Sequence, residues 1–171
     1  MERPVGTIAQ AQADIRQAYL GGGPGTAVSG SVWLAAGLVA QEPGVKAGFL
    51  VLYFGGLLIF PLSLLVVRGL FRRPALPPGS LGERIVGETV IPMIGGLLGA
   101  WLLLPFRPEL VLPMAAIAVG AHDFGFRSAY GDRTFWLPGA ILCGIRLAPI
   151  FLVPGSAPTV GARPRCCSER G

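Results

Sequence analysis

The chain has 171 residues, of which 52% are hydrophobic and only 13% are charged, and its formal net charge is +5. Soluble domains carry about 25% charged residues, so this chain has too few charges to cover an apolar core in water. Its 14 lysines and arginines are scattered singly or in pairs, not gathered in a basic stripe with interleaved aromatics, which argues against nucleic-acid binding. The totals predict one small domain whose solvent, and main partner, is the lipid bilayer.

Residues 1–21 are predicted to form a cytoplasmic N-terminal segment. The apolar residues here recur near helical spacing, with polar residues mostly opposite; they are Ile8, Ala11, Ile15, Ala18 and Tyr19. This pattern indicates a weakly amphipathic helix on the membrane surface, ended by the glycines at 21–23 and by Pro24. The segment also contains Gln, Asp and Arg where a secretory leader would be continuously apolar, so no signal peptide is expected.

Five apolar stretches approach the length of about 20 helical residues that crosses a bilayer. Together they predict an all-α, membrane-embedded helical bundle over residues 22–153, with spans at 22–40, 47–67, 89–106, 110–126 and 135–153. They are continuously apolar rather than alternating, which excludes barrel strands. Prolines fall inside the last four stretches, and we expect them to kink the helices; they are Pro61, Pro92, Pro113, Pro138 and Pro149.

The orientation follows from the positions of the cations. With the N-terminus inside, eight arginines flank the inner ends of the spans, namely Arg3, Arg16, Arg68, Arg72, Arg73, Arg84, Arg127 and Arg133. The outer connections hold only Lys46 and Arg107. Because Lys and Arg accumulate on the cytoplasmic side, the N-terminus is predicted to be cytoplasmic.

The C-terminal part departs from this pattern. Residues 154–171 are rich in Pro, Arg and Cys without helical period, and we expect an irregular, disordered tail. Arg146 also lies in the fifth apolar stretch, where an arginine costs about 2.5 to 3.5 kcal/mol on insertion scales. One hypothesis is a change of reading frame near Cys143 or Gly144, with loss of a sixth span; the alternative is a genuine, divergent tail.

The stretch 120–136, GAHDFGFRSAYGDRTFW, is the candidate functional site and is predicted to be the cytoplasmic turn between the fourth and fifth spans. In a functional interpretation, His122 carries protons with Asp123 or Asp132 as its partner, and Arg127 and Arg133 hold an anionic group. In a structural interpretation, the aromatics form an interfacial belt, the arginines set topology, and YGDR is a turn. The candidate cluster is therefore His122, Arg127, Asp132 and Arg133.

Other signatures of chemistry are missing from the sequence. The single histidine has no HExxH or related spacing around it, and the three cysteines form no CxxC pair, so no metal site or cofactor is expected. A nucleophile elbow and a phosphate-binding loop are also absent.

Small residues four apart predict close helix packing. Such pairs occur at Gly95 and Gly99, Gly96 and Ala100, Ala116 and Gly120, and Ala140 and Gly144. Packing within the chain is one use of these pairs, and a homo-oligomer through Gly95 and Gly99 is the other.

Three segments are distinctive: DIRQAYLGGGPG near the N-terminus, PMIGG in the third span, and the turn AHDFGFRSAYGDRTFW. On these segments the chain resembles a family of small bacterial integral membrane proteins of unknown function, over residues 14–143. The resemblance implies a helical bundle in the plasma membrane of a bacterium and carries no activity, cofactor or catalytic residue. In this chain Asp123 follows the histidine, where the family pattern has an aromatic.

Two functions are consistent with these features. The first is a non-enzymatic membrane protein, either a small permease-like component or an accessory subunit. The alternative is a membrane-embedded enzyme that acts on lipid or another anionic group through the polar turn between spans four and five.

Overall fold

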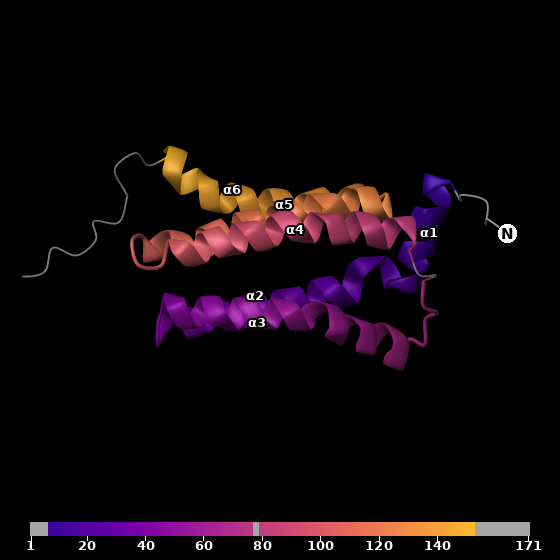
Figure 1. Cartoon of the computed structure of the whole chain (residues 1–171), viewed down its shortest axis with the longest axis horizontal. Coiled ribbons are helices and arrows are strands. Elements are labelled where there is room, and N and C mark those ends of the chain that lie inside the picture. The colour runs from indigo at the N-terminus through magenta and orange to yellow at the C-terminus, as the bar shows by residue number, and fades with distance from the viewer. Residues whose placement is uncertain (1–6, 77–78, 153–171) are drawn as a thin grey trace, which may run out of the picture.

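The computed structural model describes residues 7–76 and 79–152, which form an all-α bundle without strands in these ranges (Figure 1). Six α-helices make up the bundle: α1 Ile8–Ala18, α2 Gly23–Gln41, α3 Val45–Leu64, α4 Leu81–Leu102, α5 Val111–Tyr130 and α6 Trp136–Leu152. A π-helical turn, Leu65–Leu70, extends α3, and short 3-10 turns precede α2, α5 and α6. The predicted fold class is confirmed. The tail at 154–171 and Arg3 lie outside the described residues.

Helix α1 is confirmed as a short helix before the first long one. Thr7 and Gln10 form a capping box, in which each side chain accepts a hydrogen bond from the other residue's backbone N–H. The C-terminal part of its apolar face is covered by protein, since Ile15 and Ala18 are buried and α1 packs on α4 and α5, whereas Ile8 is 64% exposed. Tyr19 ends the helix, and the left-handed glycines Gly21 and Gly22 turn the chain into α2.

Helices α2 and α3 form a tightly packed hairpin. A Cβ atom at Gly48 would lie 2.6 Å from Cβ of Ala40, and one at Gly55 would lie 2.6 Å from Cγ1 of Val32. These glycines therefore allow the two backbones to approach closely. Phe49 and Leu52 extend from α3 into the apolar core.

Helix α4 begins eight residues before the predicted third span, which started at residue 89. The hydroxyl of Ser80 accepts a hydrogen bond from the backbone N–H of Glu83, and the acidic residue lies in the first helical turn. Both features stabilise a helix N-terminus. The polar residues 81–88 are thus the first two turns of a helix, and the connection after α3 is correspondingly shorter than predicted.

Helices α4, α5 and α6 pack in sequence, α5 lying between the other two (Figure 1). Gly96 of α4 meets Ala118 of α5, where an added Cβ would lie 2.6 Å from Cβ of Ala118. Gly120 of α5 meets Gly139 of α6, where an added Cβ at Gly139 would lie 2.9 Å from the Gly120 carbonyl oxygen. Of the small residues on α6, Gly139 therefore makes this contact, whereas Ala140 and Gly144 are exposed and do not pack within the described chain.

The prolines divide into two classes. Pro61 and Pro92 lie inside α3 and α4, and the π-helical turn follows Pro61 by one turn. Pro113 and Pro138 are each the third residue of their helix, where the missing N–H leaves no helical hydrogen bond unmade. The expectation of internal kinks at Pro113 and Pro138 is therefore wrong. Pro149 and Arg146 belong to α6.

Three helical segments are long and apolar enough to cross a membrane by length and composition: Val45–Leu70, Leu81–Leu102 and Pro108–Tyr130. In an apolar stretch of 18 residues within each segment, only 17%, 11% and 22% of the residues, respectively, are buried inside the bundle. Large apolar side chains such as Leu57, Ile91 and Leu102 point outward, each more than half exposed. The apolar surface of this bundle therefore faces its surroundings rather than its core.

The cations are segregated along the bundle. Helix α1, the connection between α3 and α4, and the turn between α5 and α6 lie at one end, and the α2–α3 and α4–α5 connections lie at the other (Figure 1). The first end carries Arg16, Arg68, Arg72, Arg73, Arg84, Arg127 and Arg133, and the second carries Lys46 and Arg107. We call the first the arginine end.

Candidate functional site

The stretch 120–136 is mostly helix, which differs from the predicted turn. Helix α5 continues to Tyr130, and the turn proper consists of Gly131 and Asp132. Gly131 adopts a left-handed conformation (φ 67°) and its N–H donates to the Arg127 carbonyl at 2.8 Å, which closes the helix. Within the predicted YGDR turn, Gly131 and Asp132 form the turn, Tyr130 ends α5 and Arg133 begins a 3-10 turn, whereas His122 and Arg127 belong to the last turns of α5.

His122 contacts α4. Its Nδ1 lies 2.7 Å from the hydroxyl of Thr89, and this hydroxyl also lies 2.8 Å from the Val86 carbonyl, to which it donates. Because the hydroxyl has a single proton, its bond to Val86 requires the tautomer of His122 in which Nδ1–H donates to Thr89. The His122 ring also meets the Phe126 ring edge to face, with centroids 4.7 Å apart.

The other three candidate residues have different neighbours. The Arg127 guanidinium lies over the ring of Trp136, 5.3 Å from its centroid, a cation–π contact that joins α5 to α6. Oδ1 of Asp132 accepts the backbone N–H of Thr134 at 2.9 Å. This hydrogen bond holds the pKa of the exposed Asp132 carboxyl below its usual value. No hydrogen bond or ion pair joins any two of the four in the part of the chain that is described.

The structure thus places all four residues at or near the arginine end but does not assemble them around a common point. Asp123 also makes no hydrogen bond with His122 among the described contacts. The described residues include no group of three or more His, Cys, Asp or Glu side chains that could hold a metal ion.

Helix α1 completes the arginine end. Nε2 of Gln12 donates to the Ser128 carbonyl at 2.9 Å, and Nη1 of Arg16 donates to the Tyr130 carbonyl. These two carbonyls belong to the last turn of α5, whose acceptors have no partner within the helix. A positive charge at this position also offsets the negative end of the helix dipole. Arg16 therefore caps a helix that lies more than a hundred residues away in sequence.

Tyr19, the C-cap of α1, contacts α4. Its hydroxyl donates to Oε1 of Glu83 in the first turn of α4, at 2.8 Å. Burial and the neighbouring Glu83 carboxylate both raise the pKa of the Tyr19 phenol, because each disfavours the charged phenolate. Tyr19 is therefore a neutral hydrogen-bond donor that ties α1 to α4.

The aromatics of the stretch do not form one surface belt. Phe126, Tyr130 and Phe135 pack together, with the Tyr130 and Phe135 centroids 5.0 Å apart, beneath Ile15 of α1. Tyr130 is only 7% exposed, whereas Trp136 is 51% exposed. Only part of the predicted interfacial belt therefore reaches the surface.

A polar groove of about 300 Å³ opens beside this cluster. Its lining comes from α1, the end of α5 and the turn after it: Gln12, Arg127, Ser128, Gly131 and Arg133. We refer to it as the arginine groove.

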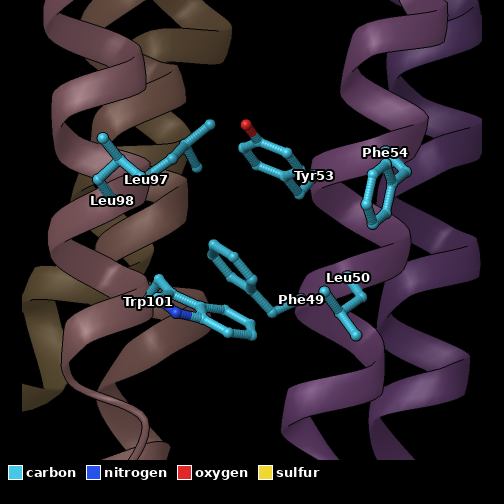
Figure 2. Close-up of a pocket in the computed structure, with 7 residues that line it drawn as sticks. All are labelled: Phe49, Leu50, Tyr53, Phe54, Leu97, Leu98 and Trp101. Atoms are coloured by element: carbon cyan, nitrogen blue, oxygen red, sulfur yellow. The ribbon is translucent and has the colours of Figure 1, made fainter.

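A second, apolar groove of about 210 Å³ lies between α3 and α4 (Figure 2). Phe49 and Tyr53 extend from α3 toward Leu97 and Trp101 of α4, with the Phe49 and Trp101 centroids 5.6 Å apart. Leu50, Phe54 and Leu98 complete its lining. We refer to it as the aromatic groove.

Sequence reasoning missed Thr89, Gln12 and Arg16 as partners in this region. Thr89 was placed at the start of a span, and its contact with His122 joins residues 33 apart. Gly125 could have indicated this contact, since a glycine within a helix often marks the place where a second helix packs closely. An added Cβ at Gly125 would overlap the side chain of Thr89.

The sequence model of DUF7010, a family of unknown function, matches residues 8–164 of the chain. The chain belongs to this family. The DUF7010 match includes residues 14–143, the region of the predicted resemblance. Searches of curated proteins and of solved structures found no match.

Proposed function

We propose that this DUF7010 chain is a non-enzymatic integral membrane protein of the bacterial plasma membrane, with α2 to α6 crossing the bilayer. One observation carries the proposal: the three long apolar segments direct most of their residues outward. Only 11% to 22% of the residues in the 18-residue apolar stretch of each segment are buried. Exposing this much apolar surface to water costs about 25 cal/mol per Å². In a bilayer the same surface meets hydrocarbon and that cost vanishes.

The distribution of charge supports a cytoplasmic N-terminus. Seven arginines of the described chain lie at the arginine end, two cations lie at the other, and Arg146 lies within α6. This asymmetry is the one that membrane insertion selects, with Lys and Arg retained inside. Helices α2 and α6 complete the spans in this proposal, although they are less apolar or shorter than the other three.

Membrane extraction tests the proposal. Membranes from expressing cells are washed with alkaline carbonate, which releases peripheral proteins, and then treated with a mild detergent. We expect the chain to stay in the pellet through the wash and to dissolve only with detergent. Release by carbonate alone would contradict insertion.

The role of a small permease-like or accessory component is supported by how the helices group. Helices α2 and α3 pack mainly with each other, as do α4, α5 and α6 (Figure 1). Contact between the two groups is sparse, and the aromatic groove lies where they meet. Two groups of helices around a central groove is an arrangement in which one group can rock against the other.

Distance measurements separate the two roles. Spin labels at Leu62→Cys on α3 and Ile94→Cys on α4 occupy exposed positions, in a background where the three natural cysteines are replaced by serine. A permease-like role predicts two distance populations in lipid nanodiscs. One narrow population would instead favour an accessory role with a fixed structure.

The enzyme alternative has weaker support. A general acid or base must lie within hydrogen-bond reach of its proton, and His122, Arg127 and Asp132 each have a separate partner. These candidate residues share no reaction centre.

A further inference from the structure

We propose that the arginine groove binds the phosphate of an anionic membrane lipid, with Arg127 and Arg133 as the binding residues. This inference rests on the proposed membrane location. The groove is open, holds about 300 Å³, and is lined by five residues, two of which are arginines. A phosphate group with its ester oxygens fits in such a volume, and the groove opens at the surface.

The two arginines are free to bind an anion. Within the described ranges the ion pair present is Arg107 with Glu109, at the opposite end of the bundle. Arg127 and Arg133 are exposed and have no carboxylate within ion-pair distance in the described part of the chain. An unpaired guanidinium presents a planar fork of N–H donors that matches two phosphate oxygens.

Backbone carbonyls that would repel an anion already accept hydrogen bonds, whereas Asp132 keeps its negative charge. The carbonyls of Ser128 and Tyr130 accept hydrogen bonds from Gln12 and Arg16, and the Arg127 carbonyl accepts the Gly131 N–H. The Asp132 carboxylate accepts the Thr134 N–H. Arg16 adds a third positive charge beside the groove, so the local balance of Arg16, Arg127 and Arg133 against Asp132 is positive.

The position of the groove selects a lipid as the source of the phosphate. Trp136 is exposed directly beside Arg127, and the Arg127 guanidinium stacks on its ring. An exposed tryptophan at the end of an apolar helix marks the headgroup level of a bilayer. The groove therefore opens at the depth of lipid phosphates, where anionic headgroups are concentrated and free phosphate is not.

The test uses the full chain in nanodiscs with spin-labelled lipids. We expect the chain to immobilise labelled phosphatidylglycerol more strongly than labelled phosphatidylcholine. Arg127→Gln with Arg133→Gln should lower this preference on the order of tenfold, because charge-assisted hydrogen bonds are lost along with charge. The matched control is Arg72→Gln with Arg73→Gln, which removes equal charge from exposed residues at the same end.

The outcomes are distinct. A loss confined to the groove variant supports the site, whereas equal losses in both variants would show general attraction to anionic lipid and overturn it. Binding of inorganic phosphate without preference among lipids would overturn the lipid assignment. If the double variant does not insert, Arg133→Gln alone should still reduce the preference. Incorporation of the wild-type chain into nanodiscs is measured separately. A chain that does not incorporate contradicts the proposed membrane location, whereas an incorporated chain without lipid preference contradicts only the proposed binding site.

Discussion

The hydroxyl of Thr89 and Nδ1 of His122 lie 2.7 Å apart and join the first half of α4 to the last turns of α5. The two residues are the polar partners in a largely apolar helix interface, and the contact gives the chain's single histidine a structural role. Gly125 lies one turn after His122 and leaves the space that Thr89 occupies. These three residues hold α4 and α5 together at this position.

Replacing Thr89 by valine removes the hydroxyl while keeping the shape of the side chain. We expect Thr89→Val to destabilise the fold by about 1 kcal/mol, the size of a typical net hydrogen bond. Unfolding in mixed detergent micelles with increasing dodecyl sulfate measures the change. Thr26→Val is the matched control, since the exposed Thr26 hydroxyl bonds only to the Gly22 carbonyl within its own segment; an equal loss there would show that the contact with His122 contributes nothing.

Gly125→Ala should destabilise more than Thr89→Val does. The new methyl overlaps the Thr89 side chain, and overpacking of this kind costs about 1 to 3 kcal/mol. Gly95→Ala is the control because no atom lies within 4 Å of its added Cβ. The same micelle titration compares the variants, and equal stability of the two would refute the close contact between α4 and α5.

The two glycine pairs of α4 should behave differently. Gly96→Val should destabilise the monomer, because an added Cβ would lie 2.6 Å from Ala118. Gly95 and Gly99 have open space around them, so valine there should leave monomer stability unchanged. If this face mediates the homo-oligomer that the sequence leaves open, the Gly95→Val and Gly99→Val variants should lose it. Energy transfer between donor- and acceptor-labelled chains in bilayers measures this, and unchanged transfer would remove the face from consideration.

Helix α1 should detach when its anchors are lost. Arg16→Met removes the donor to the Tyr130 carbonyl, and Tyr19→Phe removes the donor to Glu83. Each bond involves one charged group, Arg16 or Glu83, and such hydrogen bonds contribute about 1.5 to 3 kcal/mol, so each substitution should weaken the docking of α1 by about this amount. Hydrogen exchange of residues 8–18 should accelerate while exchange within α3 stays unchanged. Acceleration throughout the chain would mean global unfolding rather than release of α1.

Much of the fold could be predicted from the sequence. Helix α3 was predicted well because its apolar residues run without a charge from Ala47 to Val67. The start of α4 was missed because Glu83, Arg84 and Glu88 look like loop residues when charge alone is counted. The Ser80 and Glu83 spacing is a capping signal, and it marks the helix start correctly.

The candidate site was harder to predict. The histidine, aspartates and arginines of residues 120–136 are close in sequence, but a helix turns successive side chains to different faces. His122 therefore faces α4, whereas Arg127 faces Trp136 on α6. The contacts of Gln12 and Arg16 with the end of α5 depend on how α1 docks, and local patterns do not contain that information.

Cysteine labelling tests the orientation of the bundle. In a background without the natural cysteines, Thr134→Cys lies at the arginine end and Pro43→Cys lies at the opposite end. An impermeant maleimide added to intact cells should label position 43 and spare position 134 until the membrane is opened. The reverse pattern would place the N-terminus outside.

The central claim is that lipid chains surround the outward-facing apolar residues. Lipids brominated within their acyl chains quench tryptophan on contact, and a variant that retains only Trp101, with Trp33 and Trp136 replaced by phenylalanine, reports from the partly exposed face of α4. We expect strong quenching of Trp101 by brominated lipid and little quenching by iodide in the surrounding water. Strong iodide quenching of a folded chain, with no effect of the brominated lipid, would contradict the account.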